Sequence, residues 1–313
     1  MSFASDVKNE LVRVEESSIC CEQSELAALI RMGGTVFLAG GGHLGLKFVT
    51  ENASVARKML KALKKEGLAD TEVKVSRALR LKKHNSYELK AVSSDAVEEF
   101  LRRVGIVSEE VFVDHAVSSP RKICCRKAWL RGAFLGGGSV NRPEGEYHLE
   151  LVTQNESFAM TLVQSLKSFG MIAGLTLRKQ DYVVYLKEGD AIISFLGIIG
   201  AHEALMAFEN VRIVKDMRNQ VNRLVNCETA NLAKTVNAAV RQTESIKRIA
   251  SHRGIDSLPK SLREAAEMRL AYPEATLKEL VDLFDGKISR SGINHRLRAL
   301  ERIGEELLEG KMP

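Results

Sequence analysis

The chain has 313 residues, of which 45% are hydrophobic and 27% charged, and its formal net charge is +6 at pH 7. This length allows two or three domains with cores of their own, and the composition is ordinary for a soluble globular protein. The positive balance favours a polyanionic partner only weakly. The first residues are too polar for a secretory signal, and the longest nearly apolar run, Ala191 to Ala201, is too short to span a bilayer. The sequence therefore predicts no membrane partner.

Two stretches of the chain repeat one another. Residues 19–21 (Ile-Cys-Cys) and 26–35 recur 104 positions later as residues 123–125 and 130–139. Matches continue between residues 46–56 and 149–159, where the offset is 103. A nearly constant offset over so long a stretch indicates an internal duplication. Two copies predict a pseudo-two-fold body, and such a body suits a pseudo-two-fold ligand such as DNA.

Each copy predicts the same elements in the same order, and the apolar spacing distinguishes its helices from its strands. An apolar helix that ends in glycines comes first. The elements that follow are a strand (43–50 or 147–153), a helix (54–66 or 156–169), two strands (71–81 and 86–92, or 175–179 and 181–186) and a helix (94–104 or 189–196). We therefore expect an α+β body with one half at 1–112 and a second half at 113–208.

After residue 208 the sequence becomes basic and helical. Val211 to Arg302 contains 18 Lys or Arg against 11 Asp or Glu, and shows almost no strand pattern. The predicted helices cover 212–224, 228–253, 259–271, 277–284 and 289–308. We expect a basic helical linker at 209–245 and an all-α domain at 246–313. The basic residues along 212–253 either extend a nucleic-acid footprint or form the solvated face of a linker helix.

The last two predicted helices have the spacing of a helix-turn-helix. Thr276 is a good N-cap, and Glu279 completes a capping box. The segment Asp285-Gly286-Lys287 interrupts the helical pattern, and Ser289 or Ser291 then caps a second helix that starts at residue 292. An ordinary helical hairpin with a solvated basic face is the alternative interpretation.

The first turns of that second helix predict a surface that reads bases. In such motifs these residues enter the major groove, where Arg pairs with guanine and Asn with adenine. Lys287, Ser289 and the helix N-terminus suit phosphate contacts. The predicted DNA-binding residues are Thr276, Lys278, Lys287, Ser289, Arg290, Ser291, Asn294, His295, Arg296, Arg298 and Arg302.

Two further patterns predict structure more readily than chemistry. The five Cys form two adjacent pairs plus Cys227, which is not the spacing of a zinc site. We interpret the pairs as reduced, buried thiols at the start of each central helix, with a metal or redox cluster as the alternative. The glycine runs at 40–42 and 136–138 match no phosphate-binding motif and predict helix ends and close packing. No metal or cofactor is predicted.

Residues 26–35 and 130–139 resemble the LAGLIDADG helix of homing endonucleases. The resemblance covers about residues 19–208 and implies two such helices packed side by side at the centre of a pseudo-two-fold body. In that family small residues let the two helix backbones approach each other. The residues that match this role are Ala27, Ala28, Gly132 and Ala133.

The catalytic positions of that family are not preserved. The resemblance implies that the last acidic residue of each motif binds the metal, and the matching positions here are Gly33 and Gly137. Metal-dependent cleavage needs carboxylate ligands. Glu22 and Glu25 are expected before the first helix, at the end opposite to the position where a catalytic metal would bind. We therefore predict a scaffold that is not an enzyme, with a divergent endonuclease as the alternative.

A LAGLIDADG-like body followed by this helix-turn-helix resembles the WhiA family of bacterial transcriptional regulators. The most specific pieces are residues 228–231, Arg241-Gln242 and residues 289–297. The resemblance implies a role in sporulation or in cell division and chromosome segregation, in a cytoplasmic, nucleoid-associated protein. The expected partners are double-stranded DNA and a co-regulator or RNA polymerase. A protein-interaction module with weak DNA affinity is the alternative, and the sequence does not predict the target site or oligomeric state.

Overall fold

A computed structural model describes residues 2–16, 18–38, 43–77, 85–92, 94–107 and 118–308. The chain divides into two compact units, Met1–Lys215 and Asp216–Pro313. The first unit mixes helices with two four-stranded sheets, and the second unit is helical throughout its described residues. This confirms the predicted α+β class followed by an all-α domain. Within the described residues, no helix is long and apolar enough to cross a bilayer.

The first unit contains two copies of one arrangement, preceded by α1 (Phe3–Leu11). The first copy consists of α2 (Ile19–Gly33), β1 (Gly34–Leu38), β2 (Leu44–Thr50), α3 (Ala53–Lys65), β3 (Thr71–Arg77), β4 (Asn85–Ala91) and α4 (Asp95–Arg103). The second consists of α5 (Ile123–Gly137), β5 (Gly138–Val140), β6 (Leu149–Thr153), α6 (Glu156–Ser168), β7 (Gly174–Arg178), β8 (Asp181–Leu186) and α7 (Gly189–Ile199).

The two sheets have the same topology. Their strand orders are β1-β2-β4-β3 and β5-β6-β8-β7, and all neighbouring strands are antiparallel. This correspondence confirms the duplication. The structure adds α1, β1 and β5 to the predicted elements. The glycines at 40–42 and the predicted end of β3 at Leu81 lie outside the described residues.

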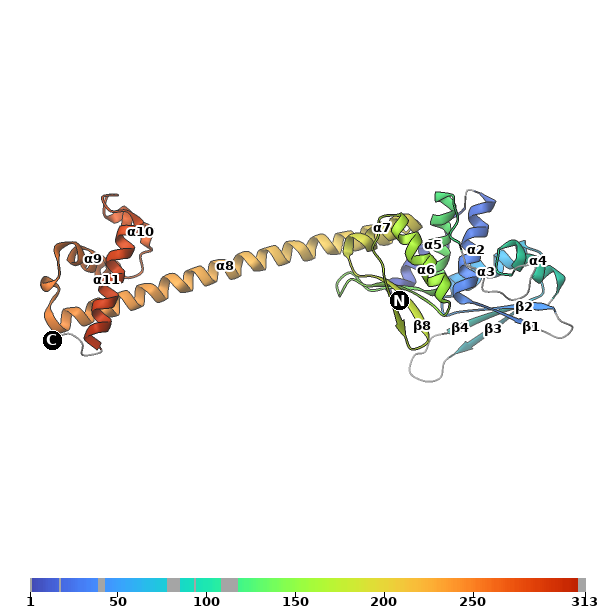
Figure 1. Cartoon of the computed structure of the whole chain (residues 1–313), viewed down its shortest axis with the longest axis horizontal. Helices are drawn as coiled ribbons and strands as arrows, with labels where there is room; N and C mark the ends of the chain where they lie inside the picture. Colours follow the sequence, from blue (N-terminus) through green and yellow to red (C-terminus); the bar gives the residue numbers. More distant parts are fainter. Residues whose placement is uncertain are drawn as a thin grey trace. The chain divides into compact units, whose positions relative to one another are not determined.

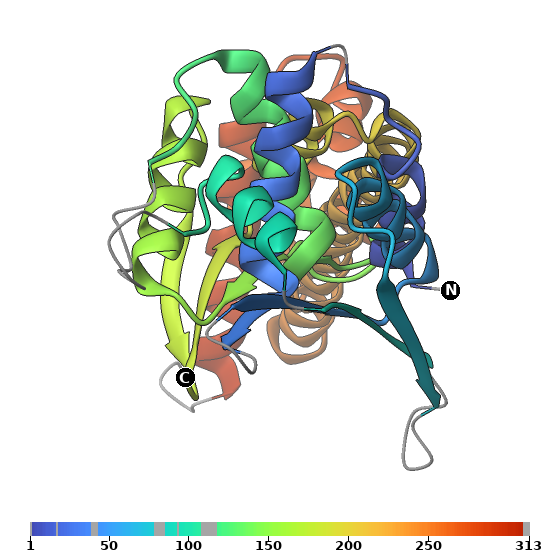
Figure 2. The same cartoon turned by 90° about the vertical axis from the view of Figure 1, so that its right-hand side faces the viewer.

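Helices α2 and α5 lie side by side on one face of the sheets (Figures 1 and 2). Their backbones touch, because a Cβ added to Gly132 would lie 2.1 Å from the carbonyl oxygen of Glu25. A Cβ at Gly136 would lie 2.5 Å from the Cβ of Met32. Ala28 and Ala133 are fully buried. The predicted close approach of two small-residue helices is confirmed.

One expectation about α2 is wrong. Glu22 and Glu25 lie inside the helix and not before it, because α2 begins at Ile19. No proline or glycine interrupts residues 19–32, and Cys21 and Glu25 are both buried. The helix therefore extends well beyond the apolar motif at its N-terminal side.

The second unit has a core of its own. Helix α8 (His202–Arg253) begins in the first unit and is followed by the 3₁₀ turn η2 (Ile255–Ser257), α9 (Lys260–Ala271), α10 (Leu277–Leu283) and α11 (Arg290–Leu308). One cluster of buried apolar residues forms this core: Ile246, Ile249, Leu258, Ala265, Ala266, Leu280, Ile293, Leu297 and Leu300. The end of α8 thus packs with α9, α10 and α11.

Helix α8 is continuous where the sequence predicted two helices, 212–224 and 228–253. The break is absent because no Gly or Pro lies between His202 and Arg253. The helix ends at Gly254, whose φ of 78° is readily adopted by glycine. The predicted linker at 209–245 lies within this helix.

Candidate nucleic-acid interface

The start of α10 is fixed by the predicted capping box. The backbone N–H of Thr276 donates to Glu279 Oε2 at 2.7 Å, and the N–H of Glu279 donates to Thr276 Oγ1 at 3.3 Å. Hydrogen bonds from Thr276 lower the pKa of the Glu279 carboxyl. At neutral pH the carboxylate therefore stays ionised at the positive end of the helix.

A tight turn joins α10 to α11. Asp285 and Gly286 adopt φ values of 50° and 68°, and the N–H of Gly286 donates to the carbonyl of Val281 at 3.2 Å. The hydroxyl of Ser289 accepts from the N–H of Gly292 at 3.2 Å and so caps α11. The helix starts at Arg290, which agrees with the predicted range 289–308 and with Ser289 as its cap, and lies two residues before the alternative start at residue 292.

Helix α11 presents one face to its core and the opposite face to solvent. Ile293, Leu297 and Leu300 are buried. On the opposite side, every residue at positions i, i+4, i+7 and i+11 is exposed. These residues, which we call the α11 outer face, are Ser291, His295, Arg298 and Arg302. Asn294 is half-buried beside them.

Arg296 has a different environment from its neighbours. Its side chain is 25% exposed, and its Nη1 lies 3.8 Å from Glu264 Oε2 on α9. The guanidinium is thus directed toward the protein, and the outer face consists of other residues. The remaining predicted residues are exposed at the start of α10, in the turn and at the start of α11: Thr276, Lys278, Lys287, Ser289 and Arg290.

Several residues that hold α11, or the chain before α10, in place were not predicted for this role. Arg248 on α8 donates to the carbonyl of Gly304 at 2.9 Å. Gly304 is buried against Ser245, and a Cβ added there would lie 2.7 Å from the Ser245 Cβ. On α9, Arg269 is 2% exposed and donates to the carbonyl of Ala275 at 2.6 Å. The sequence could have indicated that Arg269 is buried, because it lies at a position of the apolar stripe of α9.

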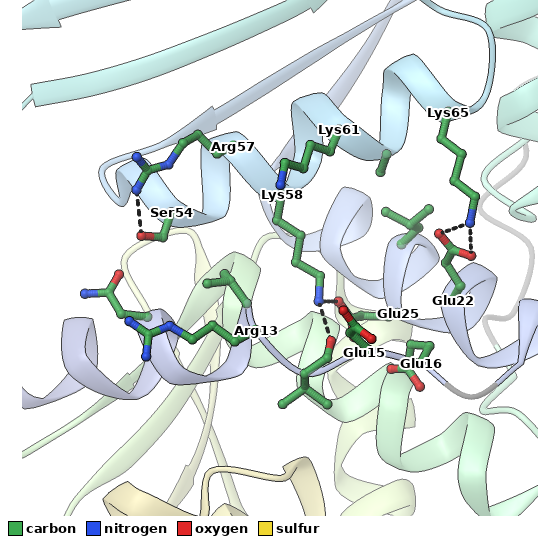
Figure 3. Close-up of a pocket in the computed structure, with 15 residues that line it drawn as sticks. Arg13, Glu15, Glu16, Glu22, Glu25, Ser54, Arg57, Lys58, Lys61 and Lys65 are labelled. Carbon is green, nitrogen blue, oxygen red and sulfur yellow. Dashed lines mark hydrogen bonds and ion pairs between the residues drawn. The ribbon is translucent and has the colours of Figure 1, made fainter.

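The first unit has a groove of about 920 Å³, lined by charges of both signs, between α3 and the chain that leads into α2 (Figure 3). Its charged lining consists of Arg13, Arg57, Lys58, Lys61, Lys65, Glu15, Glu16, Glu22 and Glu25. Lys58 and Lys65 each lie 2.6 Å from a carboxylate oxygen, of Glu25 and Glu22 respectively. These ion pairs reduce the attraction of the groove for phosphate.

A buried ion network joins this groove to α5. Arg131 Nε donates to Glu25 Oε2 at 2.8 Å, its Nη1 donates to the Ile199 carbonyl at 2.8 Å, and its Nη2 contacts Glu16. Burial acts to lower the pKa of Arg131, but the bonds and charges of Glu25 and Glu16 raise it overall. Burial raises the pKa of the Glu16 carboxyl. The guanidinium of Arg131 thus contacts both Glu25 and Glu16.

The two positions that match catalytic acids are closely packed. A Cβ at Gly137 would lie 2.6 Å from the carbonyl oxygen of Val152 on β6 and 2.6 Å from Met32 Cε. A Cβ at Gly33 would lie 2.7 Å from the ring of Phe48. A carboxylate at Gly137 would therefore require a shift of the β6 backbone.

Models of one protein family match three parts of the chain. They are the WhiA N-terminal LAGLIDADG-like domain at 19–107, the WhiA LAGLIDADG-like domain at 126–218 and the WhiA C-terminal HTH domain at 221–304. The chain belongs to the WhiA family. The HTH match contains α9, α10 and nearly all of α11, and thus every residue of the α11 outer face.

Relatives in the WhiA family match the chain along nearly its whole length. A probable cell division protein WhiA of Desulforamulus reducens is 50% identical, over 99% of this chain and 98% of its own length. Another, from Desulfitobacterium hafniense, is 49% identical over 99% of this chain and 97% of its own. A crystal structure of full-length DUF199/WhiA from Thermatoga maritima is 26% identical, with a TM-score of 0.59, and covers 98% of this chain and 99% of the other.

Proposed function

We propose that this WhiA family member is a DNA-binding transcriptional regulator that acts in cell division and chromosome segregation or in sporulation. The HTH domain and the names of the cell division relatives support the proposal. DNA binding would make the protein cytoplasmic and nucleoid-associated. The duplicated body would add affinity or contact a second protein, either a co-regulator or RNA polymerase.

The observation that carries the proposal is the α11 outer face. A capped short helix and a tight turn lead into a helix whose solvent side holds Ser291, His295, Arg298 and Arg302. In helix-turn-helix proteins this side of the second helix enters the major groove. Arg298 lies about two turns into the helix. Among the described ion pairs, Arg296 is paired with Glu264, whereas Arg298 is in none. We assign base reading to Arg298 and Asn294, and phosphate contacts to Lys287, Ser289 and Arg290.

The test compares binding to a genome-selected duplex and to random DNA across a salt titration. The intact protein should prefer the selected site by about a thousandfold or more. Arg298→Ala should weaken binding to the selected site by roughly 1–3 kcal/mol, unevenly across sequences, because it removes a base contact. Fluorescence anisotropy with labelled duplexes measures both affinities.

Arg223→Ala is the matched control, because Arg223 is exposed on α8 and its loss removes the same charge. This variant should leave the ratio of the two affinities unchanged. If Arg298→Ala weakens binding to the selected duplex and to random DNA equally, Arg298 contacts only the DNA backbone. If, in addition, Asn294→Ala leaves the ratio unchanged, α11 is not the reading helix.

A further inference from the structure

Three thiols converge where α2 and α5 begin. The Sγ atom of Cys125 lies 3.4 Å from that of Cys20 and 3.9 Å from that of Cys21. All three sulfur atoms lie within 4.8 Å of one another, and all three cysteines are free of disulfides. Residues far apart in the sequence thus supply one compact group of sulfur ligands.

The spacing of these sulfurs matches a coordination shell. Zn–S bonds of about 2.3 Å in a tetrahedral site place neighbouring sulfurs about 3.8 Å apart. We propose that Cys20, Cys21 and Cys125 bind one zinc ion, with Cys124 as its fourth ligand. Each coordinating thiol would release its proton to solvent when the metal binds.

The duplication supplies the fourth ligand. Cys125 occupies the position in α5 that Cys21 occupies in α2, and Cys124 is likewise the counterpart of Cys20. Cys20 lies beside Cys125, and the duplication predicts that Cys124 lies near Cys21 in the same way, outside the group of three sulfurs that lie within 4.8 Å of one another. Cys124 is exposed, so its side chain has room to turn toward the other three sulfurs. The group would then be a four-thiolate site with two ligands from each helix.

The surroundings suit a negatively charged metal–thiolate group. Both cysteine pairs lie in the first turn of a helix, where the helix dipole favours negative charge. A cavity of about 560 Å³ reaches Cys20 and Cys125, and its lining includes the cations Arg121 and Lys122. The cavity provides a path for the ion. Four thiolates select soft metals such as zinc and do not select magnesium.

This site would differ from the metal position of the related nucleases. Gly33 and Gly137 lie at the C-terminal ends of α2 and α5, whereas the thiols lie at the N-terminal ends of the same helices. Zinc here would join the two halves of the body and stabilise their pairing, because it binds only when both helices are in place.

The experiment measures zinc in full-length protein prepared without affinity metals, then dialysed under reducing conditions against equimolar zinc. We expect about one zinc per chain by mass spectrometry of the metal, and a thiolate-to-metal absorption band after replacement by cobalt. Cys125→Ser should lower zinc affinity by more than the roughly 10- to 100-fold caused by loss of an outer-shell partner. Cys20→Ser provides a second variant at a half-buried position, in case Cys125→Ser does not fold.

Cys227→Ser is the matched control, because Cys227 is exposed on α8 and outside the cluster. It should bind zinc like the unmodified protein. Zinc should also raise the unfolding temperature of the unmodified protein but not that of a folded Cys20→Ser variant. Less than stoichiometric zinc in folded, reduced protein would overturn the proposal. Equal zinc binding by Cys20→Ser would overturn it as well.

Discussion

Arg131 is a cation removed from water, with only 6% of its surface exposed. A buried guanidinium is tolerated only when its charge and its N–H groups are satisfied, and Glu25, Glu16 and the Ile199 carbonyl do this. Glu25 is in turn shared with Lys58. The network therefore ties α5 to α2, to α3 and to the segment after α1.

Replacement of Arg131 by Met should destabilise the first unit by about 3–5 kcal/mol, because Glu25 would keep a buried charge with only Lys58 to balance it. Urea unfolding followed by circular dichroism measures the change. Arg57→Met is the control, since Arg57 is exposed on α3 and its loss should change stability by less than about 0.5 kcal/mol. Equal changes in the free energy of unfolding for the two substitutions would show that the buried network contributes no more to stability than an exposed arginine does.

At the scale of elements, Gly304 sets how closely α11 approaches α8. A Cβ at this position would lie 2.9 Å from the Cα of Ser245 and 3.1 Å from its carbonyl oxygen, so the α8 backbone would have to move. Gly292, in the same helix, has no such constraint. Its added Cβ would meet only the side chains of Ile288 and Ser289, at 3.1 and 3.4 Å.

Gly304→Ala should therefore destabilise the second unit by a net amount of about 1 kcal/mol. Overpacking costs about 1–3 kcal/mol, and the better helix propensity of Ala returns at most about 1 kcal/mol. Gly292→Ala should be neutral or stabilising by up to about 1 kcal/mol, because it gains propensity without a backbone clash. Thermal unfolding of both variants checks the sign, and a more stable Gly304→Ala protein would contradict the packing described here.

The same elements show what local sequence signals can and cannot predict. The capping box at Thr276 and the apolar stripe of α11 act within one or two turns, so the sequence alone is enough to predict both helices. The inward direction of Arg296 depends on Glu264 in another helix, and the burial of Glu25 depends on Arg131. Such long-range pairs leave no periodic signal in the chain.

The extent of α8 was predicted less well than the capping box of α10 and the apolar stripe of α11. The sequence predicted separate helices at 212–224 and 228–253, but the residues between them are compatible with a continuous helix, since they include no Gly or Pro. The short strands β1 and β5 directly follow a helix and were missed for a related reason. Each begins with a glycine, Gly34 or Gly138, and glycine at that position is typical of a helix end followed by a loop.

At the scale of the whole molecule, the buried residues of the two units form separate clusters. The body has the topology of a duplicated LAGLIDADG-like domain, while the surface that we propose to read DNA lies in the other unit. A nuclease would need carboxylates where the body has Gly33 and Gly137, and the backbone around Gly137 leaves no room for one.

We therefore expect the full chain to bind plasmid DNA without nicking it in magnesium or manganese. Agarose gel analysis of supercoiled plasmid is the measurement, with an active homing endonuclease on its own target as the positive control. Nicking that persists through purification and disappears when residues beside Gly33 and Gly137 are substituted would contradict this expectation.

The ion network is not repeated in the second copy of the duplicated body. The position that corresponds to Arg131 in the first half is Ala27, and the position that corresponds to Glu25 in the second half is Trp129. Two copies of the first half paired together would bury two glutamates with no guanidinium between them, and two copies of the second half would bury two arginines with no carboxylate. The pairing of one half of each kind therefore satisfies the buried Glu25 and Arg131 together, which a pair of like halves would not do.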